Sequence, residues 1–395
     1  MTQSRMAVDP GGPPEQRPTW AEVDLDAIAA NVVALKAQAA TSRLMAVVKA
    51  DAYGHGLVPA ARAALAGGAD WLAVALVEEG RALRAAGVGA PILVLAEPPP
   101  AAAGPLLDAG LTPAVYTPAF INALDHAATD RSGEPVGVHL KLDTGMRRVG
   151  VPQAGWEDVL RQVRASVGLR LEGLWSHFAV AGEPEHPFIA HQSREFRRGV
   201  DLAASLGMRP DLIHLCNSAG TLHLHEDHYD MVRPGLAIYG LEPAPGLAAS
   251  CPLRPALSFR SRLSLVKPLA AGEAVSYGLR WTAQTDTTVG TVPAGYADGV
   301  VRALSNRGEV VVRGRRVPIV GMVCMDQFLV DVGNLDARAG DDVVLIGAQD
   351  GAAVTAEDWA TWLGTANYEI VCGVGKRVPR VYVGAAGRGV DGARY

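Results

Sequence analysis

The sequence predicts an α/β protein in which an N-terminal (β/α)8 barrel of the TIM type is followed by a C-terminal, mainly β domain. Apolar strand patterns and helical patterns alternate through the first 250 residues or so. Polar residues recur just after these strands, which is where barrels build their sites. Beyond Cys251 the helical patterns give way to short alternating strands.

The barrel elements are expected in the following order. A first strand at 20–25 leads to Asp26, a good N-cap, and to a helix over 27–37. The further strands are expected at 45–49, 71–76, 92–95, 113–116, 136–142, 171–178 and 212–215, with helical patterns between them. A doubly wound open sheet is the alternative. The barrel is favoured because polar residues collect repeatedly at the strand ends.

The second domain is expected to consist of short strands and one helix. The strands are predicted at 258–265, 287–292, 309–313, 317–320, 327–332, 342–346 and 378–383, and the helix at 356–363. Prolines and a glycine cluster at 243–252 and mark the boundary. We therefore expect a barrel over residues 18–252, a β domain over 253–395 and a disordered tail over 1–17, which is rich in Pro, Gly and Gln.

Composition narrows the functional class. The 395 residues carry a net charge of -5 and contain no long basic run, so a nucleic-acid surface is not indicated. No apolar span is long enough for a membrane, and no signal peptide is evident. The four cysteines are far apart and suggest neither a zinc site nor a disulfide framework. A cytoplasmic location is the expectation.

The stretch Met45–Gly56 organises the barrel. An apolar run ends at Lys49, and small residues, Tyr53 and two glycines follow. A lysine at the mouth of an apolar interior tends to have a lowered pKa, which makes its amine a nucleophile able to form a Schiff base. The alternative is a strand-end lysine that reaches solvent along its own methylenes.

Further polar residues follow other predicted strands. Lys141 and Arg148 follow the sixth, His177 the seventh, and His214 with Ser218 the eighth. Ser218, Tyr53 and the amides after Arg233-Pro234-Gly235 would form a phosphate cradle of neutral donors. A phosphate cradle beside a reactive lysine suggests pyridoxal phosphate. Each residue alone has a structural explanation, so the recurrence at strand ends carries the inference.

Two other patterns are set aside. His223, His225 and His228 have metal-ligand character but are interpreted as a polar surface segment. Gly373-Val374-Gly375-Lys376 lacks the remaining residues of a phosphate loop, and no dinucleotide-binding glycine motif follows a strand.

The motifs of this chain resemble those of the alanine racemase family from Trp20 to Tyr382. The resemblance rests on the segments 47–56, 139–146, 176–178, 217–219 and 233–235 in the first domain and on 275–278, 295–299 and 324–327 in the second. It implies a pyridoxal 5′-phosphate enzyme that interconverts L-alanine and D-alanine. Lys49 would hold the cofactor as a Schiff base and act as the base on the D face. Tyr277 would act on the L face, and it would reach the partner's site because family members are head-to-tail homodimers.

The resemblance also implies the remaining site residues. The expected cofactor-binding residues are Lys49, Tyr53, Arg148, His177, Asn217, Ser218, Arg233, Gly235 and Leu236. Arg148 and the Met325 backbone would bind the substrate carboxylate. The expected supporting residues are Lys141, often carbamylated in the family, His214 behind Arg233, Tyr296 and Asp326. No metal is expected. Because a tyrosine ordinarily titrates near 10, nearby cations must lower the pKa of Tyr277 if it is to act as a base.

Three positions depart from the family pattern: Gly182 stands where an acid is usual, Met322 where an arginine is usual, and Lys376 where a tyrosine is often found. The resemblance places them at the substrate entrance, so a wider amino-acid range than alanine is an alternative. A decarboxylase on the same fold, a non-catalytic cofactor-binding protein and a low-activity paralogue are rival readings. The tyrosine motif at 277 and the complete second domain argue against the first two.

Overall fold

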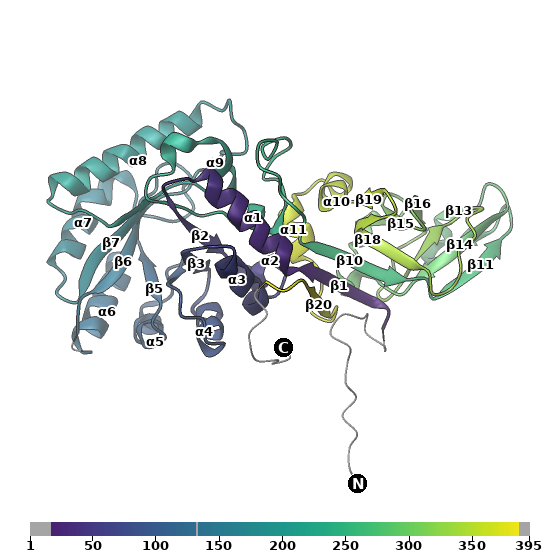
Figure 1. Ribbon diagram of the computed structural model, residues 1–395, viewed down its shortest axis with the longest axis horizontal. Coiled ribbons are helices and arrows are strands. Elements are labelled where there is room, and N and C mark those ends of the chain that lie inside the picture. Colours follow the sequence, from purple (N-terminus) through teal and green to yellow (C-terminus); the bar gives the residue numbers. More distant parts are fainter. Residues whose placement is uncertain (1–16, 132, 387–395) are drawn as a thin grey trace, which may run out of the picture. The chain divides into compact units, whose positions relative to one another are not determined.

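The computed structural model describes residues 17–131 and 133–386. The tail predicted at 1–17 therefore lies, except for its last residue, outside the described residues. Two compact units are present (Figure 1). One, the barrel unit, contains residues 26–52 and 56–254. The other, the β unit, contains residues 17–25, 53–55 and 255–384.

The barrel unit is built on eight parallel strands in the order β8-β7-β6-β5-β4-β3-β2-β9. They are β2 (Arg43–Val47), β3 (Trp71–Val74), β4 (Ile92–Val94), β5 (Thr112–Val115), β6 (Val136–Lys141), β7 (Leu169–Trp175), β8 (Leu212–His214) and β9 (Met231–Val232). The amide of Asp230 donates to Ile213 O and that of Arg233 to Cys216 O, so these bonds join the β9 segment to the β8 segment. The predicted barrel class is confirmed, because the ring of strands nearly closes.

Helices lie outside these strands (Figure 1). They are α1 (Leu25–Gln38), α3 (Leu57–Ala66), α4 (Val77–Ala85), α5 (Ala103–Asp108), α6 (Pro118–Thr129), α7 (Trp156–Ala165), α8 (Phe188–Ser205) and α9 (Ser218–His223), with short 3-10 turns that include η4 (Leu236–Tyr239). The short element α2 (Lys49–Tyr53) follows β2 and has left-handed backbone. Helix α6 shows how the sequence sets a start: Thr117 accepts the Phe120 amide and Pro118 stands at the first position. Strands such as β3 and β4 are buried throughout, as expected when helices cover a parallel sheet.

The expectation that the strand at 20–25 opens the barrel is wrong. Strand β1 (Thr19–Asp24) pairs antiparallel with β10 (Leu257–Arg262) and parallel with β20 (Arg380–Val383), both in the β unit. The eighth barrel strand is β9 instead. Because β9 has two residues, its pattern is too short to be recognised in the sequence.

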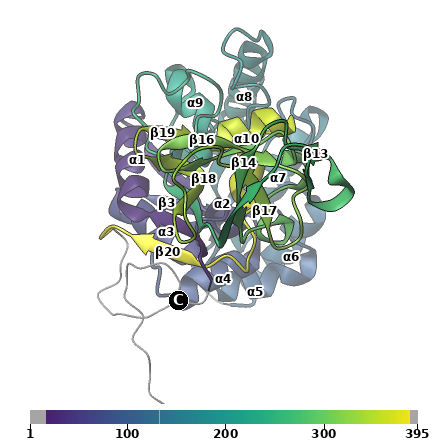
Figure 2. The ribbon, with the colours of Figure 1, turned by 90° about the vertical axis from the view of Figure 1, so that its right-hand side faces the viewer.

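The β unit contains a sheet in the order β11-β14-β17-β16-β15-β18-β10-β1-β20, with β19 paired to β18. Figure 2 turns this unit toward the viewer. The further strands are β11 (Leu265–Leu269), β12 (Ala274–Val275), β13 (Trp281–Thr282), β14 (Thr287–Val292), β15 (Glu309–Val312), β16 (Arg315–Val320), β17 (Phe328–Asp331), β18 (Asp342–Gln349) and β19 (Ala352–Val354), with helices α10 (Ala356–Leu363) and α11 (Asn367–Cys372). A mainly β second domain is thereby confirmed. Within the described residues, none of the helices has both the length and the apolar character needed to cross a bilayer.

A buried carboxylate joins separate segments of the β unit. Asp298, in the 3-10 turn η6 (Tyr296–Asp298), is fully buried. Its Oδ2 accepts from Arg17 at 2.6 Å, and its Oδ1 accepts from Arg377 Nε at 2.7 Å. The amide of Gly295 also donates to Oδ2, at 2.9 Å. Burial by itself would raise the pKa of Asp298, but the hydrogen bonds from Arg17 and Arg377 outweigh it and hold the pKa below its usual value.

We predict that Asp298→Asn lowers the free energy of unfolding by about 3 kcal/mol at neutral pH, because two arginines lose a buried charged partner. A lowered folded-state pKa contributes stability above the unfolded pKa, near 4, and that contribution is lost as the pH falls through the folded value. The difference between wild type and variant should therefore shrink below about pH 4. Urea denaturation at fixed protein concentration, from neutral to acidic pH, measures it.

The matched control is Asp326→Asn, since Asp326 pairs with the same arginine but its side chain is 61% exposed. This variant should lose less than about 1 kcal/mol. Equal losses in the two variants would contradict the importance assigned to the buried carboxylate.

Candidate active site

Lys49 lies two residues after the end of strand β2, and a left-handed turn begins at this lysine. Ala50, Asp51, Ala52 and Tyr53 all have φ near +54°. This conformation costs a residue other than glycine roughly 1–2 kcal/mol. Four such residues in a row are therefore a local strain that other contacts must compensate. Lys49 itself is half-buried, in line with its expected place at the end of a buried strand.

Contacts from two carboxylates restrain this turn. Glu79 Oε1, on α4, accepts the amide of Ala50 at 2.6 Å. Asp51 Oδ1 accepts the amide of Leu57 at 2.7 Å, and the Asp51 carbonyl accepts the amide of Gly56. The backbone after Lys49 is thus tied both to α4 and to the start of α3.

The guanidinium of Arg233 lies at the centre of the other predicted residues. It is 3% exposed and donates from Nη1 to His214 Nδ1 at 2.9 Å, and from Nη2 to the carbonyls of Ser176 at 2.7 Å and Leu215 at 3.1 Å. Nη2 also approaches His177 Nδ1 at 3.2 Å. All these acceptors are neutral. Burial lowers the pKa of Arg233 to about 9, so it stays charged at neutral pH.

This arginine fixes the protons on two histidines behind it. A guanidinium can only donate, so His214 Nδ1 accepts and neutral His214 carries its hydrogen on Nε2. That Nε2 then donates to His139 Nδ1 at 2.8 Å. Burial and the neighbouring charge of Arg233 lower the pKa of His139 to about 3 and that of His214 well below its usual value. Both rings are therefore neutral across the physiological range.

Other cations gather at the same end of the barrel unit. Lys141 Nζ lies 4.2 Å from the ring centroid of Trp175, and the Arg233 guanidinium carbon lies 4.8 Å from it. Burial, followed by the charges of Arg233 and Arg148, lowers the pKa of Lys141 to about 7. Burial and the same cations lower the pKa of His177. The charge of Lys49 contributes to both shifts, as the smallest of the causes. The carbamylation of Lys141 stays a prediction.

Ser218 and the segment after Arg233 are in direct contact. The amides of Gly235 and Ala237 donate to Ser218 Oγ at 2.9 and 3.2 Å. The Leu236 amide between them has no partner among the residues that the structure describes. Asn217 caps α9 by accepting the Gly220 amide. The Ser218 hydroxyl hydrogen and the Leu236 amide are neutral donors of the kind that binds phosphate groups.

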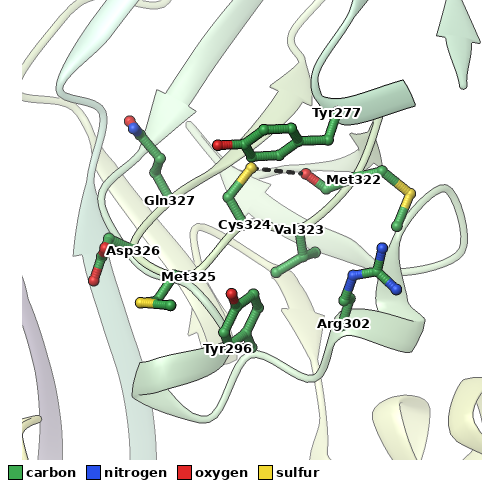
Figure 3. A pocket seen from close by; sticks show the side chains of 9 residues that line it. All are labelled: Tyr277, Tyr296, Arg302, Met322, Val323, Cys324, Met325, Asp326 and Gln327. Atoms are coloured by element: carbon green, nitrogen blue, oxygen red, sulfur yellow. Dashed lines mark hydrogen bonds between the residues drawn. The ribbon is translucent and has the colours of Figure 1, made fainter. Parts of the chain in front are cut away.

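The predicted residues of the second domain line one pocket of the β unit (Figure 3). Its volume is about 530 Å³. Tyr277 and Tyr296 lie on opposite sides of it, with Cys324 and Val323 between them (Figure 3). The remaining lining residues are Arg302, Met322, Met325, Asp326 and Gln327. Tyr277 is 76% exposed, so its phenol is open to solvent in this unit.

The loop that carries Tyr277 is strained and anchored. Ser276 and Leu279 both have positive φ. The hydroxyl of Ser276 donates to the carbonyl of Met322 at 2.8 Å. Such non-glycine residues in the left-handed region persist where surrounding contacts over-determine them, often at functional sites. Tyr277 is therefore presented from a fixed loop despite its exposure.

The loop that carries Met325 is attached to η6. The amides of Tyr296 and Ala297 donate to the carbonyls of Cys324 and Met325. A Cβ at position 295 would lie 2.3 Å from both carbonyl oxygens, so this close approach requires Gly295. Arg377 links Asp298 to Asp326, at 2.7 Å from each. The backbone of residues 324–326 is thereby held beside Tyr296.

The predicted residues therefore form two groups, one in each unit. Lys49, Lys141, Arg148, His177, His214 and Arg233 are close neighbours in the barrel unit, together with the Ser218 cluster. Tyr277, Tyr296, Met325 and Asp326 share the pocket of the β unit. Tyr53 packs against Tyr368 at a ring distance of 6.1 Å in the β unit, and burial raises its pKa. Its place beside the phosphate cradle stays a prediction.

Three functional side chains were missed in the sequence. Trp175 carries two cations on its ring, Glu79 holds the turn after Lys49, and Asp298 anchors the Met325 loop. Glu79 had a signal, because it stands at the third position of α4, where a carboxylate reaches back to cap the helix. In the described part of the chain no cluster of His, Cys, Asp or Glu is arranged to hold a metal ion.

Comparisons with known proteins agree with these motifs. The model of the alanine racemase N-terminal domain matches residues 23–243, and that of the alanine racemase C-terminal domain matches residues 256–382. The chain is 48% identical over 369 residues to an alanine racemase of Symbiobacterium thermophilum, covering 93% of this chain and 98% of the relative. It is 47% identical to one of Frankia casuarinae, over 92% of this chain and 96% of the relative.

A solved structure extends the similarity to the fold. The alanine racemase from a D-cycloserine-producing Streptomyces lavendulae matches with a TM-score of 0.90 at 43% identity, covering 94% of this chain and 98% of that one. Family matches in both domains, near-complete coverage of the relatives and the two groups of side chains point the same way. The chain belongs to the alanine racemase family of isomerases, whose members use pyridoxal 5′-phosphate.

Proposed function

We propose that this protein racemises alanine with two bases, Lys49 on the D face of the substrate's Cα and Tyr277 of a second copy on the L face. The observation that carries the proposal is the position of Lys49 at the end of β2, where its charge acts on both Lys141 and His177. Racemisation needs one base on each face of a single carbon. The exposed phenol of Tyr277, on its anchored loop, is a suitable second base.

The barrel residues fit pyridoxal 5′-phosphate. The Ser218 hydroxyl, which the amides of Gly235 and Ala237 hold in place, and the Leu236 amide, unpartnered among the described residues, suit its phosphate. The concentration of cations suits an anionic ligand. When bound, the cofactor supplies an aldehyde that joins to amines and a ring that delocalises negative charge from Cα.

Residues of the chain would then bind the cofactor ring, bind the substrate carboxylate and transfer the protons. Arg233 would donate to the ring nitrogen and keep it unprotonated, because a guanidinium does not give up its proton. Its neutral histidine partners would leave that charge undiminished. Arg148 and the Met325 backbone would hold the substrate carboxylate. Lys49 and Tyr277 would each remove a proton from Cα or return one to it.

We propose further that two copies of the chain pair so that the exposed apolar surface around Tyr277 is covered. This surface includes Leu279 at 65% exposure, Met325 at 53%, Tyr296 at 44% and Val301 at 42%. Exposed apolar side chains gathered on one surface are typical of protein–protein contact sites. A head-to-tail dimer would provide each active site with one Lys49 and one Tyr277 from different chains.

We predict that Tyr277→Phe lowers kcat by about 10²–10⁴-fold, the usual contribution of a general base. Cofactor content should be unchanged. In deuterated water the variant should still exchange the Cα hydrogen of D-alanine, the substrate of Lys49, but not that of L-alanine. Proton NMR of each enantiomer measures this.

Tyr382→Phe removes a phenol from strand β20 of the same unit, outside the pocket, and serves as the control. It should exchange both enantiomers as wild type does. Exchange of L-alanine at the wild-type rate by Tyr277→Phe would refute the role of Tyr277 as a base.

Met322 supports a second candidate function, racemisation of larger neutral amino acids beside alanine. Its side chain is 8% exposed and forms an apolar part of the pocket wall where the family usually has an arginine. We predict that wild type turns over such amino acids. Met322→Arg should reduce kcat/KM for them, relative to alanine, by about tenfold, as expected for losing one apolar contact. Kinetics over an amino-acid panel measure it.

Met322→Leu preserves volume and apolar character and should keep the wild-type preferences. Wild-type activity confined to alanine would exclude the wider range while leaving alanine racemisation intact.

A further inference from the structure

We propose that Glu79 is a positioning residue for Lys49. By accepting the amide of Ala50, it holds the left-handed turn that sets the direction in which the lysine leaves strand β2. This inference rests on the proposed role of Lys49 in binding the cofactor and in proton transfer.

The turn needs an external restraint. Ala50, Asp51 and Ala52 have φ and ψ near +50°, with no glycine to relieve the strain. A chain free to relax would leave this region and rotate the backbone next to Lys49. Because Ala50 is the next residue after the lysine, a hydrogen bond at its amide acts on the peptide that joins the two.

Glu79 is itself fixed before it reaches the turn. Its Oε2 accepts the amides of Ala75 at 2.8 Å and Leu76 at 3.1 Å, the bonds expected of a residue that caps the start of α4. Capping requires one oxygen. The second, Oε1, accepts the amide of Ala50 at 2.6 Å from the adjoining strand–helix unit. A hydrogen bond to an ionised carboxylate is roughly twice as strong as a neutral one.

The far end of the turn is restrained separately. Asp51 Oδ1 accepts the amide of Leu57, and the Asp51 carbonyl accepts that of Gly56. These bonds fix where the turn enters α3. At the end next to Lys49 the Ala52 amide donates to the Val48 carbonyl at 2.9 Å, which closes the turn on itself. The Glu79 bond ties that end to another element, α4, so its loss should move the lysine more than it disturbs α3.

The test is Glu79→Gln in the enzyme with its cofactor, with Glu78→Gln as the matched control. A glutamine has one carbonyl oxygen, so it cannot serve Ala50 and cap α4 together. Glu78 is the preceding residue of the same helix and is exposed, and its carboxylate makes no hydrogen bond or ion pair among the described residues. Amide hydrogen exchange of the segment 49–57 and kcat and KM per bound cofactor are measured.

In wild type the Ala50 amide should be protected from exchange although its residue is exposed. In Glu79→Gln its exchange should rise about tenfold and kcat should fall about tenfold, with KM nearly unchanged, because substrate is held by other residues. Glu78→Gln should match wild type in all three. If the amount of folded protein falls but kcat per bound cofactor does not, Glu79 acts only as a helix cap and the proposal is overturned.

Two further outcomes would overturn it. One is an unprotected Ala50 amide in wild type, a measurement that needs no variant to fold. The other is faster exchange in Glu79→Gln with unchanged kcat.

A separate experiment distinguishes a failure of this proposal from a failure of the proposed function. Borohydride reduction followed by peptide mapping identifies the lysine that carries the cofactor. Cofactor attached to a lysine other than Lys49 would refute the proposed function, whereas the exchange data would still report the Glu79 contact.

Discussion

The buried guanidinium of Arg233 is the constraint on which the barrel end of the site depends. It is surrounded by acceptors without charge, namely His214, His177 and two backbone carbonyls. Its charge is therefore not neutralised locally, and it acts on every titratable group nearby. Burial first, and this charge second, lower the pKa values of Lys141, His139, His177 and His214. The result is a group of side chains rich in cations and in neutral donors, suited to an anionic ligand.

In the β unit, an exposed phenol is held with little conformational freedom. Tyr277 is open to solvent, yet the residues on both sides of it have strained backbone that Ser276 anchors to Met322. Below it, the Met325 loop is held to η6 by backbone bonds and by the Arg377 bridge between Asp298 and Asp326. Backbone strain of this kind lowers stability locally, while the rigid support places the reacting groups more precisely.

Much of the site in the barrel unit could be predicted from the sequence. Polar side chains that follow consecutive parallel strands must meet at one end of the sheet. Lys49, Lys141, His177 and Arg233 are neighbours for that reason. The same logic failed for β1, whose alternation identifies a strand but not its partner. The roles of Glu79, Trp175 and Asp298 depend on contacts across 29 to 79 positions of sequence or on ring geometry, which no local pattern encodes. The pairing of Lys49 with Tyr277 was inferred from family motifs rather than from spacing.

The most direct test of the two-base, two-chain account is a hybrid dimer. Lys49→Ala and Tyr277→Phe chains, each nearly inactive as a homodimer, are mixed under mild denaturant, allowed to reassociate and separated by distinct affinity tags. If each site combines Lys49 of one chain with Tyr277 of the other, the hybrid contains one intact site and should recover about half of the wild-type activity per dimer. A hybrid as inactive as its parents would contradict the account, because it would mean that both bases of a site come from the same chain or that one of them is not a base.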